Sequence, residues 1–161
     1  MNIELCKAEI TRHEGKVLEI YEDSLGYKTL GIGHLCQPED PEYDWEVGTP
    51  VSEEVVDMYF EDDFNKHLSE TIHVFGTEEA FYNLPSDIQR VLVNMCFNLG
   101  GTRLSKFKNM LTACRAHDWN EMARQMEDSR WFGQVGRRSN CLLYTSDAAD
   151  EGLGVDLGGR R

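Results

Sequence analysis

The apolar positions at the start of the chain recur first at helical spacing and then in alternation. The residues at helical spacing are Ile3, Cys6 and Ile10. A glycine at position 15 can adopt the left-handed conformation that ends a helix. From Val17 the apolar period becomes two, with turn residues over 23–26 and a second alternating run over 27–32. The pattern predicts a helix that stops at Gly15, followed by a β-hairpin.

Helical spacing returns after an acidic segment. Residues 37–48 combine prolines with many acids, which predicts an exposed loop. Ser52 precedes two glutamates, as at a helix N-terminus, and an apolar stripe then continues for about five turns to Ile72. This segment predicts one long helix.

The second half of the chain shows four shorter helical patterns. The first covers about 78–84, and the second begins with Ser86 as its cap and ends at Gly100. A third begins at Leu104, and Asp118 with an acid three residues later opens a fourth. Their apolar faces predict an all-helical second lobe.

Length and composition limit the class of protein. The chain has 161 residues, of which 40% are hydrophobic, enough for one domain with room for two lobes. No stretch approaches the roughly 18 apolar residues of a membrane-spanning helix, and the first ten residues do not resemble a signal peptide. Five widely spaced cysteines indicate reduced thiols. We therefore expect a cytoplasmic protein without membrane insertion or disulfides.

Charge is distributed unevenly along the chain. The net charge is −13, but residues 1–87 carry −16 whereas residues 88–140 carry +5. A polyanionic partner should meet the second half more readily, unless the acidic half is simply a solvated surface. The overall acidity argues against nucleic acid as a partner. His67 and His73 lie six residues apart rather than four, and the acidic loop lacks the EF-hand order, so we expect no metal site and no cofactor.

Two carboxylates flank the predicted hairpin. Glu14 lies at a helix end, Asp23 begins the turn, and Thr29 lies in the second strand, so the three side chains can face one space. A pair of carboxylates around a cleft is the requirement for hydrolysis of a glycosidic bond. Helix-end glutamates are usually just solvated, so the residue types alone make a weak case.

The glycine pattern around these carboxylates strengthens the case. The chain resembles the phage-type lysozymes, the endolysins and muramidases typified by those of the T-even phages, over about residues 1–140. The resemblance is carried by Glu14-Gly15, Tyr21-Glu22-Asp23, the run 26–35, the block 94–100 and Ser129-Arg130-Trp131-Phe132. The family's catalytic Glu, Asp and Thr fall on Glu14, Asp23 and Thr29.

The resemblance implies a fold and an activity. The fold is α+β and mainly helical, with two lobes: an N-terminal lobe with a small β-hairpin sheet over about 1–51, a linking helix over about 52–73 and a helical lobe over about 74–140. The activity is hydrolysis of the β-1,4 bond between N-acetylmuramic acid and N-acetylglucosamine in peptidoglycan, by a monomer. The enzyme would wait in the host cytoplasm until it is released to the wall and lyses the cell. The alternative is a non-catalytic glycan-binding or virion structural module on the same fold.

The resemblance also assigns residues that bind the glycan. By position they are Leu35, Phe97, Met110, Gln125, Arg130 and Arg138. Leu35 and Phe97 match the family in type, whereas Met110 and Gln125 do not. Arg138 corresponds to an arginine that approaches the catalytic Glu, and His34 is implied to form an ion pair with Asp63 on the linking helix.

The resemblance ends at Cys141. Residues 141–161 look like the translation of a DNA sequencing adapter instead of the expected final helix, so we interpret them as a non-native tail. Four glycines and no apolar period argue against a packed helix across 152–159.

Overall fold

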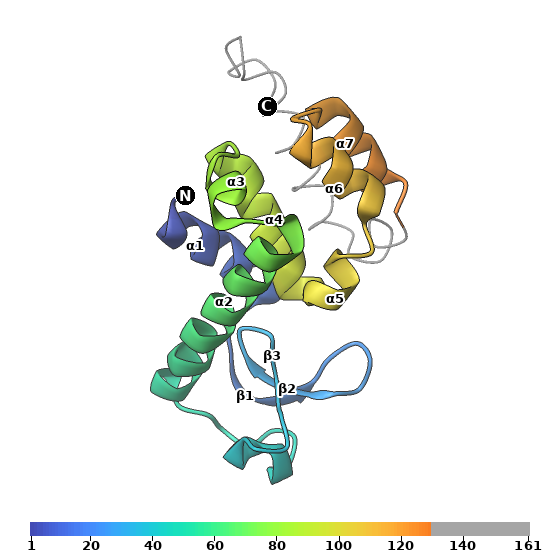
Figure 1. The fold of residues 1–161 in the computed structure, drawn as a ribbon. Helices are drawn as coiled ribbons and strands as arrows, with labels where there is room; N and C mark the ends of the chain where they lie inside the picture. Colours follow the sequence, from blue (N-terminus) through green and yellow to red (C-terminus); the bar gives the residue numbers. More distant parts are fainter. Residues whose placement is uncertain (130–161) are drawn as a thin grey trace. The chain divides into compact units, whose positions relative to one another are not determined.

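The computed structural model describes residues 1–129, and the predicted tail at 141–161 therefore lies outside the described residues. The described part is mainly helical with one small antiparallel sheet, which confirms the predicted α+β class (Figure 1). Its elements in chain order are α1 (Ile3–Glu14), β1 (Val17–Glu22), β2 (Lys28–Gly31), β3 (His34–Leu35), the 3-10 helix η1 (Pro41–Asp44), α2 (Glu53–Phe75), α3 (Glu78–Tyr82), α4 (Ser86–Leu99), α5 (Gly101–Leu104), α6 (Lys108–Arg115) and α7 (Trp119–Glu127). No helix among them is long and apolar enough to cross a membrane.

The chain divides into two compact units. The sheet unit is Glu4–Lys66, and the helical unit is Met1–Ile3 together with His67–Arg161, of which the structure describes the residues up to Ser129. Helix α2 belongs to both units, with the division between Lys66 and His67.

The sheet unit begins as its sequence pattern predicts. Helix α1 ends at Glu14, and Gly15 follows with φ 80°, its amide donating to the carbonyl of Thr11 at 2.8 Å. The sheet order is β1-β2-β3, with antiparallel pairs throughout and an irregularity between Val17 and Tyr21. The short third strand was not predicted, since two residues are too few to show an alternating pattern.

Two glycines allow close packing beside β2. Gly31 has φ 61°, and a Cβ on it would lie 2.8 Å from Cγ1 of Val56 on α2. Gly33 has φ 65° and forms part of the tight turn between β2 and β3. Only glycine adopts this backbone region without strain, and only glycine leaves room for the neighbouring side chain.

The helical unit is held by a core of large apolar side chains that are almost fully buried. They include Phe81, Ile88, Leu92, Met95, Leu104, Trp119, Met122 and Met126. The predicted cap at Asp118 is confirmed, because its carboxylate accepts a hydrogen bond from the amide of Glu121 at 3.2 Å.

Three local predictions were wrong. Pro85, not Ser86, is the N-cap of α4, so Ser86 is already helical. Leu104 ends the short helix α5, and α6 starts after the N-cap Phe107, so the predicted single helix is two. The acidic loop is not wholly exposed, because Glu42 within η1 is buried against the phenol of Tyr59.

Candidate active site

Glu14 is held at the C-terminal end of α1, where Gly15 turns the chain into β1. Its half-buried side chain packs against the turn that follows β2: a Cβ on Gly33 would lie 2.5 Å from Oε1 and 3.0 Å from Cδ of Glu14. Residue 33 therefore has to lack a side chain for this carboxyl group to take its position.

Asp23 is fixed by the turn that it begins. Its Oδ1 accepts hydrogen bonds from the backbone amides of Leu25 and Tyr27, each at 2.9 Å. Its own amide donates to the carbonyl of Tyr27, and the amide of Gly26 donates to its carbonyl. Two backbone donors on one oxygen fix the orientation of this half-buried carboxylate.

The sheet register brings Thr29 into line with two further residues. Tyr21 of β1 pairs with Thr29 of β2, which pairs with Leu35 of β3. Directly opposite residues of neighbouring strands lie on the same face, so the three side chains form one row. Thr29 is buried and donates its hydroxyl hydrogen to the carbonyl of Tyr27 at 2.9 Å, which leaves its oxygen lone pairs as acceptors. Leu35 is 45% exposed, as a surface contact requires.

Tyr21 of β1 lies near enough to both carboxylates to feel their charges. Burial raises the pKa of its phenol, and the negative charges of Glu14 and Asp23 raise that pKa further. One hydroxyl group thus lies in the electrostatic field of both carboxylates, and its residue shares a row with Thr29. Sequence reasoning used Tyr21 only as part of a motif and gave it no role. Its position opposite Thr29 in the hairpin register was the signal that could have found it.

The third strand is anchored by a charged cluster around His34. The ring of His34 is hydrogen-bonded through Nδ1 to Asp63 and through Nε2 to Asp40, each at 2.7 Å. The contact with Asp63 confirms the expected pair, whereas Asp40 was not foreseen. Tyr59 stacks on the imidazole at 4.0 Å between ring centroids and donates its hydroxyl hydrogen to Glu42.

The two carboxylates require the imidazolium form of His34. Burial by itself lowers the pKa of His34, but the hydrogen bonds to Asp63 and Asp40 and their negative charges outweigh burial and raise the pKa above its ordinary 6.5. A neutral ring would turn a lone pair toward one of the carboxylates. This cluster stabilises β3, which follows Gly33. It therefore also stabilises the turn at Gly33 against which Glu14 packs.

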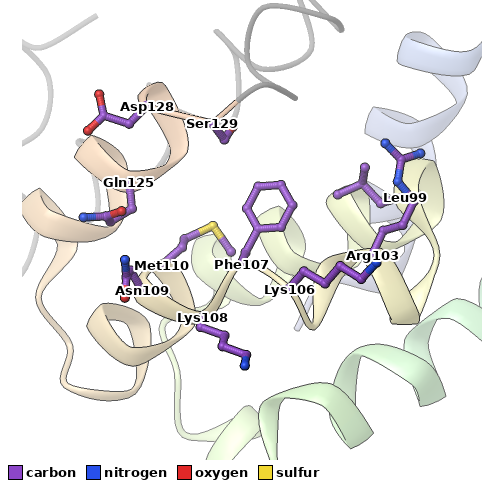
Figure 2. A pocket seen from close by; sticks show the side chains of 10 residues that line it. All are labelled: Leu99, Arg103, Lys106, Phe107, Lys108, Asn109, Met110, Gln125, Asp128 and Ser129. Atoms are coloured by element: carbon purple, nitrogen blue, oxygen red, sulfur yellow. The ribbon is translucent and has the colours of Figure 1, made fainter.

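The helical unit contains the other predicted contact residues that the structure describes. Met110 on α6 and Gln125 on α7 line a common pocket of about 480 Å³ (Figure 2). The full lining is Leu99, Arg103, Lys106, Phe107, Lys108, Asn109, Met110, Gln125, Asp128 and Ser129. Figure 2 shows the ring of Phe107 between Met110 and Leu99, with the cationic side chains around it. The lining includes three cationic side chains and one acidic side chain, so the pocket has a net positive charge.

The remaining predicted contacts differ in their positions. Phe97 on α4 is 8% exposed and does not line the pocket around Met110. Its ring lies edge-on to the imidazole of His67, with centroids 5.1 Å apart. Arg130 and Arg138 lie outside the described residues.

One group of described side chains has the chemistry to hold a metal ion. His67, Glu70 and Cys96 each offer one ligand atom, and these atoms lie within 4.8 Å of one another. All three residues belong to the helical unit.

The sheet unit holds three groups whose chemistry suits hydrolysis. A carboxyl group at a helix end, a carboxylate fixed by backbone amides and a hydroxyl oxygen in the same hairpin are suited to protonating a leaving oxygen and holding a water. The exposed Leu35 continues the row of Thr29 and offers an apolar contact.

Comparison with known proteins agrees with this chemistry. A family model described as phage lysozyme matches residues 11–147. The chain is similar to probable T4-type lysozyme 2 of Dictyostelium discoideum, with 31% identity over 146 residues, covering 81% of this chain and 86% of that protein. It is 30% identical to probable T4-type lysozyme 1 of the same organism, with the same coverage.

A third relative has a different name. The pre-baseplate central spike protein Gp5 of Enterobacteria phage T4 is 28% identical over 175 aligned positions. The alignment takes in 97% of this chain but only 30% of Gp5. The present chain thus corresponds to a minor part of that spike protein.

Proposed function

The chain belongs to the phage lysozyme family, and from this premise we propose that it hydrolyses the β-1,4 bond between N-acetylmuramic acid and N-acetylglucosamine in bacterial peptidoglycan. The observation that carries the proposal is the position of Tyr21. Burial raises the pKa of its phenol, the charges of both Glu14 and Asp23 raise that pKa further, and Tyr21 pairs with Thr29, so the end of α1 and the hairpin that follows it bring the three groups together.

Each group has a separate role in this proposal. Glu14 is the general acid that protonates the leaving glycosidic oxygen, since it is half-buried at the end of α1 and packs against the turn at Gly33. Asp23 is held in place by the amides of Leu25 and Tyr27, and it orients a water together with the oxygen of Thr29. The water attacks the anomeric carbon on the face opposite the leaving group, which inverts its configuration.

Glycan contacts are proposed for both units. Leu35 offers an exposed apolar surface beside Thr29, whereas Met110 and Gln125 contribute to a pocket with three cations. A peptidoglycan strand carries free carboxylates on its peptides, and these suit a positively charged pocket. We propose that Phe97, Arg130 and Arg138 add further contacts.

We propose an endolysin as the biological role: a monomer that stays in the host bacterial cytoplasm, reaches the wall after release and lyses the cell. This role rests on the family membership and on the catalytic groups in the hairpin.

The test is release of reducing ends from purified peptidoglycan. We expect release by the unmodified chain and a loss of at least about 10³-fold in Glu14→Gln, because the amide cannot donate a proton to the leaving oxygen. The matched control is Glu4→Gln, the same change at an exposed position on α1, which should retain activity. Nuclear magnetic resonance of the first product tests inversion: the new reducing end should appear as the α-anomer.

The second candidate is a virion structural or glycan-binding module, favoured by the similarity to the spike protein Gp5. It predicts binding to peptidoglycan without reducing-end release. Sedimentation with purified cell walls separates the two: wall binding that is equal in the unmodified chain and in Glu14→Gln, with no release from either, would support this candidate over the enzyme.

A further inference from the structure

Three side chains of different chemistry meet inside the helical unit, between α2 and α4. His67 and Glu70 are one turn apart on α2, and His67 Nδ1 lies 2.6 Å from Glu70 Oε1. Cys96 comes from the middle of α4, 26 residues further along the chain, and its thiol lies 4.0 Å from the same carboxylate oxygen. No sequence spacing could reveal this group, since the third member comes from another helix.

Neighbouring residues hold the group in place. The chain turns sharply after α4 at Gly100, and this places Gly101 beside the acid: a Cβ on Gly101 would lie 3.2 Å from Cβ of Glu70 and 3.4 Å from its Oε2. The ring of Phe97 packs against the imidazole of His67. Both α2 ligands are thus restrained before any ion binds.

We propose that His67, Glu70 and Cys96 form a binding site for Zn²⁺ or a similar borderline-soft divalent cation, linking α2 to α4. One imidazole nitrogen, one carboxylate oxygen and one thiolate are the ligand types of zinc, and three protein ligands leave a fourth position for water. With zinc–ligand bonds of about 2.0 to 2.3 Å, tetrahedral geometry separates the ligand atoms by about 3.4 to 3.6 Å.

The observed separations lie on either side of that range. The nitrogen–oxygen distance of 2.6 Å has to open and the sulfur–oxygen distance of 4.0 Å has to close, each by less than about 1 Å. Small rotations of side chains achieve this without moving a helix, because His67 and Glu70 keep 18% and 35% side-chain exposure. Solvent reaches the group at these two side chains, whereas Cys96 is fully buried.

The donor set selects the class of ion. A thiolate and an imidazole favour Zn²⁺ and Co²⁺, whereas Mg²⁺ and Ca²⁺ prefer oxygen ligands in larger number. Binding displaces the thiol proton, which passes to solvent, and gives a Cys96 thiolate bound to the metal. The site does not depend on the proposed hydrolase activity, since none of its ligands belongs to the hairpin.

The test is a Co²⁺ titration of the full chain after treatment with a chelator. A cobalt–thiolate bond gives a charge-transfer absorption in the near ultraviolet, which Zn²⁺ should abolish by displacement. We expect the band in the unmodified protein and its loss in Cys96→Ala. In His67→Gln and Glu70→Gln, Co²⁺ affinity should fall roughly a hundredfold or more, since even outer-shell partners contribute about 10- to 100-fold.

Two thiol controls make the assignment specific. Cys114→Ala removes another buried thiol of the helical unit, where burial raises the pKa to about 12 although Arg115 opposes it, so this thiol is a poor ligand. Cys141→Ser removes a thiol outside the described residues. Both variants should keep the band. Circular dichroism of the metal-free proteins checks that each variant is folded.

Thermal unfolding gives a second readout. Zn²⁺ should raise the melting temperature of the unmodified protein and of Cys114→Ala, but not that of Cys96→Ala. The proposal is overturned if the unmodified protein shows no charge-transfer band, if the band survives in Cys96→Ala, or if it disappears in either thiol control. The three side chains would then be a hydrogen-bonded group only.

Discussion

The two units bury polar side chains of different kinds. Among the described residues, the buried polar side chains of the sheet unit are Thr29, His34 and Glu42, and those of the helical unit are Thr71, Gln89 and Asn94. Each set has three members, but among the described residues only the set of the sheet unit includes a histidine and a carboxylate. There, His34 lies between two carboxylates and Glu42 accepts from Tyr59.

The difference shows how each unit is stabilised. The helical unit depends on apolar side chains such as Leu92, Trp119 and Met122, all with no exposed area. The sheet unit has a smaller apolar core. It adds charged hydrogen bonds and glycine turns, which hold polar side chains in fixed orientations. A catalytic carboxyl group needs such fixed polar surroundings. The proposed catalytic groups therefore lie in the unit that is stabilised by buried hydrogen bonds between charged side chains.

The largest expected effect tests the apolar side of this comparison. Leu92→Ala in α4 removes a fully buried side chain and leaves a cavity, so the free energy of unfolding should fall by about 4 kcal/mol. Chemical denaturation measures it. The matched control is Leu25→Ala, the same change at a residue that is 77% exposed in the hairpin turn, where we expect less than about 0.5 kcal/mol. Equal losses in the two variants would contradict apolar burial as the main source of stability.

The next effect tests the polar side. His34→Gln removes the cation between Asp40 and Asp63 and leaves two carboxylates facing a neutral amide, so we expect a loss of about 3 kcal/mol in the free energy of unfolding. His73→Gln on α2 is the control, because His73 is exposed and should change stability by less than about 0.5 kcal/mol. A small effect of His34→Gln would mean that the sheet unit does not depend on its charged cluster.

The features that the sequence predicted are those that depend on local spacing along the chain. Helices such as α1 and α2, and the caps at Gly15 and Asp118, follow from local spacing and were found at or near their bounds. Thr29 and Leu35 were proposed from the family pattern, and their alignment in one row became visible only with the sheet register. The roles of Glu14, Asp23 and Thr29 stay predictions.

Contacts between distant segments were beyond local reasoning. Asp40 reaches His34 from a loop that was expected to be exposed, and Cys96 reaches Glu70 from a different helix. Neither pair has a characteristic spacing, because the loop path and the packing of helices determine both. The break between α5 and α6 was missed for a related reason: an apolar period continues across Ser105 while the backbone does not.

The third prediction links the glycine turn to the chemistry. Gly33→Ala places a Cβ at a positive φ and 2.5 Å from the Glu14 carboxylate, so that carboxyl group has to move. A displacement of about 1 Å can reduce turnover about 100-fold, which we expect in kcat from reducing-end release. Gly15→Ala is the control, since φ is also positive there but nothing lies within 4 Å of the new Cβ.

Both glycine variants should lose about 1 to 2 kcal/mol of stability from backbone strain. The difference between them in kcat then reports the contact with Glu14 alone. Similar kcat values in the two variants would indicate that the position of Glu14 does not depend on Gly33.

The smallest effect is a pH dependence that isolates the charge of His34. Hydrogen bonds from its ring to Asp63 and Asp40 outweigh burial and raise its pKa in the folded protein. A raised folded pKa means that the stabilisation is fully present below the unfolded value of about 6.5 and is lost as pH rises through the folded pKa. The stability difference between the unmodified protein and His34→Gln should therefore be largest near pH 6 and should shrink toward about pH 8.5.

Neighbouring groups do not confuse this measurement. Burial and the hydrogen bond to Glu42 raise the pKa of Tyr59, and burial raises that of the Cys36 thiol above its ordinary 9.0, so both stay protonated across the window. Denaturation of the two proteins at several pH values gives the difference directly. A difference that stays constant from pH 6 to 8.5 would mean that His34 contributes through its shape and its stacking on Tyr59 rather than through its charge, and the sheet unit would then resemble the helical unit more than its contacts indicate.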